Sequence, residues 1–309
     1  MIQLIRPDLN VDFLSKSKPF VWFSTAAAIA SLVGLFTVGL NYGIDFTGGA
    51  AVHLRAPKGW EISQVRGALS DAGMKDAHLV QLGEPELREY LVKVQAEATH
   101  LGKVAKEVGD AIQKKAGAER YEILKTDVVG PQAGESLRVS AFLSVLYAIV
   151  LIVAYITFRF DVRYAPGVIR ALLVDVLITV GIWILIRREF NLTVLASFLT
   201  VAGYSCNDTI VIYDRIREYS TLHPNWDLAQ SINRSINQNL GRTILTVLCT
   251  LFVVGSLYLF GGPVLEDFAL PMLIGFTISI PSTIFVANPL ILYMEQRRME
   301  KLKRARVGA

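Results

Sequence analysis

The stretch YSCNDTIVIYDRIRE, residues 204–218, places two polar side chains, Asn207 and Asp208, inside an apolar run. That run extends from Leu192 to Tyr213 and is long enough to cross a bilayer, which takes roughly 20 helical residues. Lipid offers these groups no hydrogen-bond partner, so an ionisable residue at this depth is costly and points to function. Asp208 either takes part in moving a proton or only holds neighbouring helices together by hydrogen bonding.

The composition is that of an integral membrane protein. Hydrophobic residues make up 52% of the 309 residues, and the mean hydropathy is +0.43. The first apolar run is too long for the core of a secretory signal, so we expect it to be a retained anchor. Six runs are predicted to be transmembrane helices, at residues 20–40, 139–158, 168–186, 192–213, 243–260 and 268–293.

The basic residues lie at the ends of these runs and predict the orientation. Lys and Arg cluster in residues 1–19, in the 214–242 connection and in the tail 296–309, which share one side if there are six crossings. Both termini are therefore expected in the cytoplasm, although Arg187 and Arg188 fall on the other side. The net charge of +4 then reflects topology rather than nucleic-acid binding.

A polar insert, residues 41–136, separates the first two runs. Strand-like segments at 43–56, 77–82, 89–95 and 121–130 and helical patterns at 61–73 and 97–117 give the order β-α-β-β-α-β. The predicted fold class is a mostly α membrane protein, with six transmembrane helices and an external α+β ferredoxin-like domain between the first two. The other five helices form a bundle over 137–295. We also expect an amphipathic helix at 227–241 along the inner membrane surface.

Several polar side chains could share a path with Asp208. Arg242 opens the fifth run at a similar depth from the same side, and Asp175 lies in the third run. Burial and a nearby cation act in opposite directions on the protonation of a carboxyl group, which favours proton exchange. The predicted proton pathway is Asp208, Arg242 and Asp175. The supporting polar residues are Tyr204, Ser205, Asn207, Thr246 and Thr250.

Enzyme chemistry is not indicated. The sequence shows no nucleophile with a base, no cluster of metal ligands and no glycine-rich nucleotide loop. We therefore expect no catalytic residue, no metal and no organic cofactor, and protons are the expected coupling ion.

Four motifs in order carry a family resemblance: GIDFTGGA at 43–50, GYSCNDTIVIYDRIRE at 203–218, LGRTILTVLCT at 240–250 and YLFGGPVLEDFALPMLIGF at 258–276. The chain resembles the SecF half of the SecD/SecF family of bacterial protein-export membrane proteins. The resemblance covers nearly the whole chain. It implies half of the helical bundle of the resistance-nodulation-division superfamily, in the bacterial inner membrane.

The resemblance also implies partners and roles. Members work beside SecD and the SecYEG channel, with YajC as a possible further partner, and use the proton gradient to draw a translocating preprotein outward. By motif, Asp208 and Arg242 match the family's proton-pathway residues, and Asp175 matches the aspartate of the third span. Many relatives have His before that aspartate, whereas this chain has Val174. The family signature residues Asp45, Gly48 and Gly49 are expected to shape the strand that enters the external domain.

Two other functions remain open. The chain could be half of a proton-coupled small-molecule or lipid transporter of the same superfamily. It could also be a scaffold without transport activity, in which the buried charges only fix helix packing.

Overall fold

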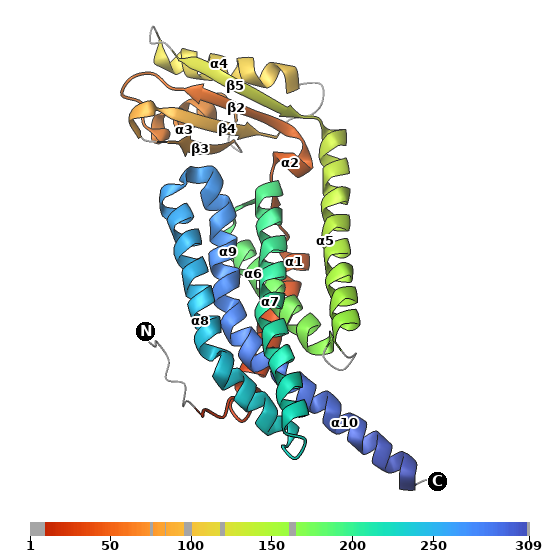
Figure 1. Ribbon diagram of the computed structural model, residues 1–309. Helices are drawn as coiled ribbons and strands as arrows, with labels where there is room; N and C mark the ends of the chain where they lie inside the picture. The colour runs from red at the N-terminus through yellow and green to blue at the C-terminus, as the bar shows by residue number, and fades with distance from the viewer. Residues whose placement is uncertain are drawn as a thin grey trace.

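The computed structural model describes residues 10–74, 77–83, 85–95, 101–117, 121–160 and 165–307. A helical bundle carries a small α+β domain at one end, and α1 begins and α10 ends at the opposite end (Figure 1). Three predicted segments lie partly outside the described residues: the N-terminal segment 1–19, the helix at 97–117 and the tail 296–309.

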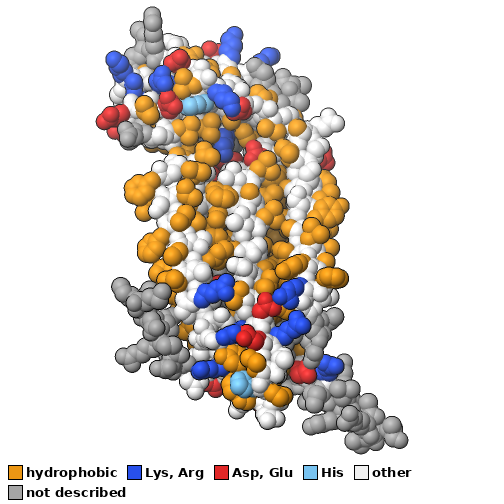
Figure 2. Space-filling model, viewed as in Figure 1, with side chains coloured by type: hydrophobic (Ala, Val, Ile, Leu, Met, Phe, Trp, Pro, Cys, Tyr) orange, Lys and Arg blue, Asp and Glu red, His pale blue; other side chains and the backbone are white. Residues whose placement is uncertain are grey.

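Six helices in the described part of the chain are long and apolar enough to cross a membrane, which confirms the predicted number. Figure 2 shows their orange apolar band between two charged ends. The helices are α1 (Ser17–Thr37), α5 (Pro131–Arg159), α6 (Ala165–Ile186), α7 (Leu192–Leu222), α8 (Leu228–Phe260) and α9 (Gly262–Ser282). A π-helical turn (Thr283–Ala287) then joins α9 to α10 (Asn288–Val307).

The helix predicted at 227–241 is not a separate element. It forms the first part of α8, which runs unbroken into the fifth span. A single glycine, Gly241, costs a helix about 1 kcal/mol but does not end it. The apolar stripe also packs against protein rather than the membrane surface, because Ile232 and Ile236 are buried in the core that includes Phe13.

The external domain (residues 49–129) has the predicted ferredoxin-like order. Its strands follow the spatial order β3-β4-β2-β5, and every neighbouring pair is antiparallel. The elements are β2 (Gly49–Arg55), α3 (Ile62–Asp71), β3 (His78–Leu82), the short helix η1 (Pro85–Leu87), β4 (Glu89–Val94), α4 (Leu101–Ala116) and β5 (Glu122–Val129).

The domain's core lies on one face of this sheet. Ala50, Val52 and Leu54 alternate along β2, are fully buried, and pack with residues of α3 and α4 such as Val65 and Val108. The sheet faces the helical bundle with its opposite side (Figure 1). By register this side carries His53 and Arg55 of β2, His78 of β3, and Glu89 and Lys93 of β4.

A carboxylate on that opposite face should make the domain sensitive to acid. Glu89 binds Arg55 at 2.8 Å and His53 Nε2 at 3.0 Å, and the Arg55 bond followed by the His53 contact lowers its pKa. A lowered folded-state pKa stabilises the fold above the ordinary glutamate pKa of about 4.3, and this stabilisation is lost as the pH falls below it. We expect Glu89→Gln to flatten the acid side of a thermal-unfolding profile against pH. An unchanged slope would contradict this role.

Candidate functional site

The Asp208 carboxyl group lies on an open side of α7. Asp208 is half-buried and Asn207, next to it, is exposed. Among the described residues Asp208 forms no hydrogen bond and no ion pair within 4.0 Å. Arg242, exposed on α8, is the charged residue whose field acts on this carboxyl group. The structure therefore brings the predicted carboxyl group and cation to the same α7–α8 face without closing them into an ion pair.

The predicted supporting residues continue this face toward the external domain. The hydroxyls of Tyr204 and Thr250 lie 3.2 Å apart and bridge α7 to α8. Thr246 donates to backbone carbonyls of its own helix at 3.0 Å. We call the set of Tyr204, Asn207, Asp208, Arg242, Thr246 and Thr250 the polar lane.

Asp175 occupies a different, closed site. It is fully buried on α6, and Ser205 of α7 donates to its Oδ2 at 2.5 Å. Thr179 bonds the backbone carbonyl of Asp175, not its carboxyl group. Ser205 is one turn from Asp208, so both carboxyls border the same part of α7, but no hydrogen bond joins them within the described chain.

The closed site has one unused hydrogen-bond position. Asp175 Oδ1 and the Ser282 hydroxyl of α9 are both buried and lie near each other, but their geometry does not make a hydrogen bond. A proton on the carboxyl would turn an oxygen that only accepts into a donor. Ser282, the last residue of α9, was not predicted from the sequence, because a single serine in an apolar run carries no distinctive spacing.

Two prolines lie in the last span without ending its helix. Pro271 and Pro281 lie inside α9, and the helix continues through the π-helical turn beside the closed site. Asn288 donates to the Thr283 carbonyl at 2.8 Å, and the hydroxyls of Thr283 and Thr209 are 3.4 Å apart. A π-helical turn satisfies backbone groups with a wider spacing, and such turns occur at functional sites.

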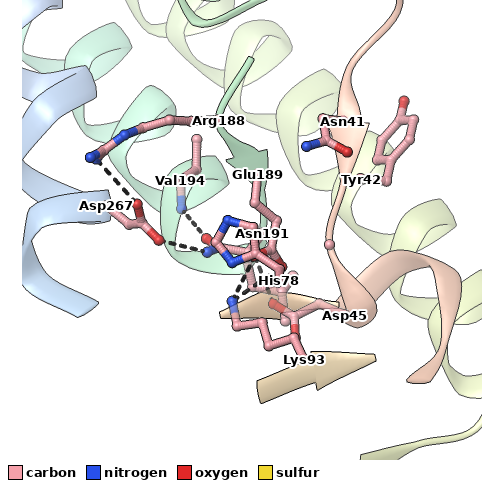
Figure 3. Close-up of polar contacts among 12 residues, drawn as sticks. Asn41, Tyr42, Asp45, His78, Lys93, Arg188, Glu189, Asn191, Val194 and Asp267 are labelled. Atoms are coloured by element: carbon pink, nitrogen blue, oxygen red, sulfur yellow. Dashed lines mark hydrogen bonds and ion pairs between the residues drawn. The ribbon is translucent and has the colours of Figure 1, made fainter. Parts of the chain in front are cut away.

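A second polar cluster joins the bundle to the external domain (Figure 3). A short parallel ribbon pairs β1 (Asn41–Tyr42) with β6 (Glu189–Phe190). Glu189 then binds Lys93 of β4 at 2.9 Å and lies 3.5 Å from His78 of β3. The membrane-facing side of the sheet is thereby attached to the α6–α7 connection.

The signature residue Asp45 has a different role from the one expected. It lies in a short helix, α2 (Ile44–Thr47), where a strand was predicted, and its carboxylate accepts from the Leu192 backbone N–H at 3.0 Å. Asn191 caps the same helix start by accepting from Val194 at 2.9 Å. Asp45 therefore satisfies an orphan donor at the start of α7. Sequence spacing does not reveal a contact over such a separation.

Arg188, one of the two arginines on the opposite side from the basic clusters, belongs to an ion-pair network. Arg188 binds Glu266 and lies 3.5 Å from Asp267, both in the first turns of α9. Asn191 also donates to Asp267 at 3.3 Å. Its local partners explain why this basic residue lies at the domain end of the bundle (Figure 3).

The Glu189–Lys93 pair should contribute measurably to stability. The Glu189 side chain is 8% exposed and that of Lys93 is 15% exposed, so Glu189→Gln leaves a largely enclosed ammonium without its counter-charge. We expect a loss of about 2 kcal/mol, seen as faster proteolysis of the external domain during a thermal ramp. The matched control is Asp127→Asn, which breaks an exposed Lys125 pair at 2.8 Å and should cost about 0.5 kcal/mol or less. Equal losses of stability in the two variants would mean that burial does not strengthen the Glu189–Lys93 pair.

Comparisons with known proteins agree with this architecture. The model of the C-terminal region of SecD/SecF protein-export membrane proteins matches residues 108–297, and the SecD/SecF GG motif matches residues 33–52. The SecF translocase subunit of Magnetococcus marinus is 40% identical, and the match covers 97% of each chain.

A longer relative contains a segment that is similar to most of this chain. The SecDF translocase subunit of Thermus thermophilus is 39% identical over 88% of this chain but only 37% of its own length. The crystal structure of SecDF from that genus, described as a translocon-associated membrane protein, superposes with a TM-score of 0.80 at 34% identity. The match covers 96% of this chain and 40% of that one. This multi-pass membrane protein therefore belongs to the SecD/SecF family of protein-export membrane proteins, in its SecF group.

Proposed function

We propose that this chain works with a SecD-type partner in the bacterial inner membrane and uses the proton gradient to promote export of secreted proteins through the SecYEG channel. The observation that carries the proposal is the polar lane, which combines a carboxyl and a guanidinium on an uncovered face of two membrane helices. Charged groups on such a face of a membrane protein need a covering partner.

The exposed side of the polar lane requires a covering partner. In lipid, exposed Asn207 and Arg242 would lack hydrogen-bond partners, which is unfavourable. A second helical bundle on this face would satisfy them and enclose the proton path between the two halves. The fused SecDF relative, with most of its length outside the match, supports SecD as the source of that bundle.

The residues would have distinct roles in this mechanism. Asp208 would exchange the proton and Arg242 would supply the opposing charge, while Tyr204 and Thr250 keep α7 and α8 in register. Asp175, with Ser205 and Ser282, would form a second acceptor in the closed site. Its carboxyl touches α7, so its protonation can change how α7 packs on α6 and α9.

The external domain would transmit movement to the exported chain. Its sheet is bound to the α6–α7 connection through Glu189, three residues before the start of α7. A shift of α7 would therefore move the domain. In this arrangement both termini are cytoplasmic, the domain faces the translocating preprotein, YajC is a candidate further partner, and protons are the coupling ion with no cofactor required.

Depletion of the gene tests the proposal against a small-molecule or lipid transporter. We expect precursors of secreted proteins to accumulate while sensitivity to drugs and detergents stays unchanged, and an intact copy should restore processing. Pulse labelling of a secreted protein measures the first effect, and growth inhibition measures the second. Normal processing with altered drug or lipid sensitivity would replace the export function with small-molecule transport.

A further inference from the structure

An apolar groove lies within the membrane part of the bundle, on the side where α5 packs. It has a volume of about 680 Å³, within the range of pockets that hold a small organic molecule. Side chains from α1, α5, α6 and α7 line it, and almost all of them are hydrocarbon. Examples from the four helices are Phe36, Ala148, Val176 and Leu199.

The groove exists because α5 stands away from the bundle between two points of close contact (Figure 1). Near its start Gly134 packs against the backbone of Phe46 and Gly48, and near its end Ile156 is fully buried. Between them Ala141 is the one buried residue of α5. Small side chains at Ala141 and Ala148 leave space that the opposing helices do not fill.

The groove opens to the surroundings and ends at a cation. Phe36 and Phe142 at its edge are 81% and 70% exposed. Arg138 lines the end nearest the external domain, and within the described chain it forms no hydrogen bond or ion pair. Glu135, one turn earlier on α5, is also exposed and does not pair with it. Arg138 is therefore available to an external anion at the depth where the apolar run of α5 begins.

We infer that this groove binds one acyl chain of a negatively charged phospholipid, with the headgroup phosphate on Arg138, in the leaflet on the side of the external domain. The inference rests on the membrane crossing and not on the proposed proton mechanism. An apolar channel capped by an unpaired arginine at the interface matches a lipid with an anionic head. An apolar helix of a partner protein could fill the groove, but it would not by itself supply an anion to Arg138.

A tryptophan behind the groove can report the bound chain. Trp183 is 1% exposed, so lipid around the protein cannot touch it. It packs with Ala141, Phe190 and Phe198, which line the groove, and its ring centre is 6.4 Å from that of Phe198. Bromine on an acyl chain quenches tryptophan fluorescence at short range. A chain in the groove should therefore quench Trp183.

The test uses the full chain with its SecD partner in phosphatidylcholine vesicles, with Trp22, Trp60 and Trp226 and the partner's tryptophans changed to Phe. Brominated phosphatidylglycerol is titrated against brominated phosphatidylcholine at equal mole fraction. We expect the Trp183 site to prefer the anionic lipid about fivefold. This is the binding ratio that corresponds to the attraction between one arginine and an anionic membrane surface. Arg138→Gln should abolish that preference, whereas Arg66→Gln in the external domain should leave it unchanged.

A second pair of variants separates the groove from general lipid contact. Ala148→Phe fills the groove and should reduce quenching by both lipids, whereas Leu151→Phe adds the same ring on the exposed side of α5 and should not. Quenching without a preference for the anionic lipid, or with a preference that survives Arg138→Gln, overturns the headgroup assignment. Quenching that occurs only in the isolated chain would show that a SecD helix occupies the groove, and overturns the lipid site.

Discussion

An Asp208→Asn variant will assemble normally and lose the gradient-dependent part of protein export. Asparagine keeps the size and hydrogen-bonding capacity of the side chain but cannot exchange a proton. Since Asp208 forms no hydrogen bond or ion pair among the described residues, the change removes no contact that holds the helices together. Translocation of a secreted precursor into inverted membrane vesicles, with and without an uncoupler, measures the effect.

The expected magnitude is complete loss of the difference that the uncoupler makes, while the export that persists with the uncoupler is unchanged. The matched control is Asp214→Asn, on the same helix. Asp214 lies 3.4 Å from Arg159, and both side chains are about half exposed, so this pair should contribute little. Full gradient-dependent export by Asp208→Asn would leave only a packing role for this carboxyl and would support the scaffold function.

Asp175→Asn gives a different expectation, because the closed site is part of the helix packing. The Ser205 hydroxyl donates to Asp175 Oδ2, and an amide in that place can turn its oxygen toward the same donor. We therefore expect partial rather than complete loss of gradient-dependent export. The structure encloses Asp175 and leaves Asp208 open. Comparing export by the two variants therefore tests whether both carboxyl groups act in one proton path.

The sequence alone predicts those features that depend on local pattern. Apolar length predicts the six membrane helices, and alternation with turn residues predicts the order of the external domain. The α7–α8 lane was also predictable, because Tyr204 and Asp208 are one turn apart on one helix and Arg242 and Thr246 are one turn apart on the next. Which lane residues meet across helices, such as Tyr204 and Thr250, required the structure.

Contacts between distant segments could not be predicted. Asp45 reaches the start of α7, and Glu189 reaches Lys93 on a strand of the external domain. Neither residue differs, in type or spacing, from an ordinary surface carboxylate. The continuity of α8 was also missed, because a polar stretch with a glycine is typical of a boundary, yet here burial of Ile232 and Ile236 stabilises a single helix.

The chain enters and leaves the external domain at one crossing point that only glycine permits. Gly48 has φ +81°, and a Cβ atom there would lie 2.8 Å from Pro131 Cα, where α5 begins. Gly134, one turn into α5, would bring a Cβ to 2.9 Å from the Gly48 nitrogen. Both neighbours are backbone, so the clash cannot be relieved by a side-chain rotation.

We therefore expect Gly48→Ala to destabilise the junction by about 4 kcal/mol, from a strained backbone and a backbone clash together. Gly59→Ala is the matched control, because Gly59 also has φ +81° but open space around it, so only about 1 kcal/mol of strain remains. Proteolysis of the external domain during a thermal ramp compares the two variants. If both variants lose the same stability, the two backbone segments can move apart at Gly48 at little cost. The positive φ angle alone then explains why glycine is needed there. A much larger loss at Gly48 would show that the close crossing itself holds the start of α5 against the start of β2.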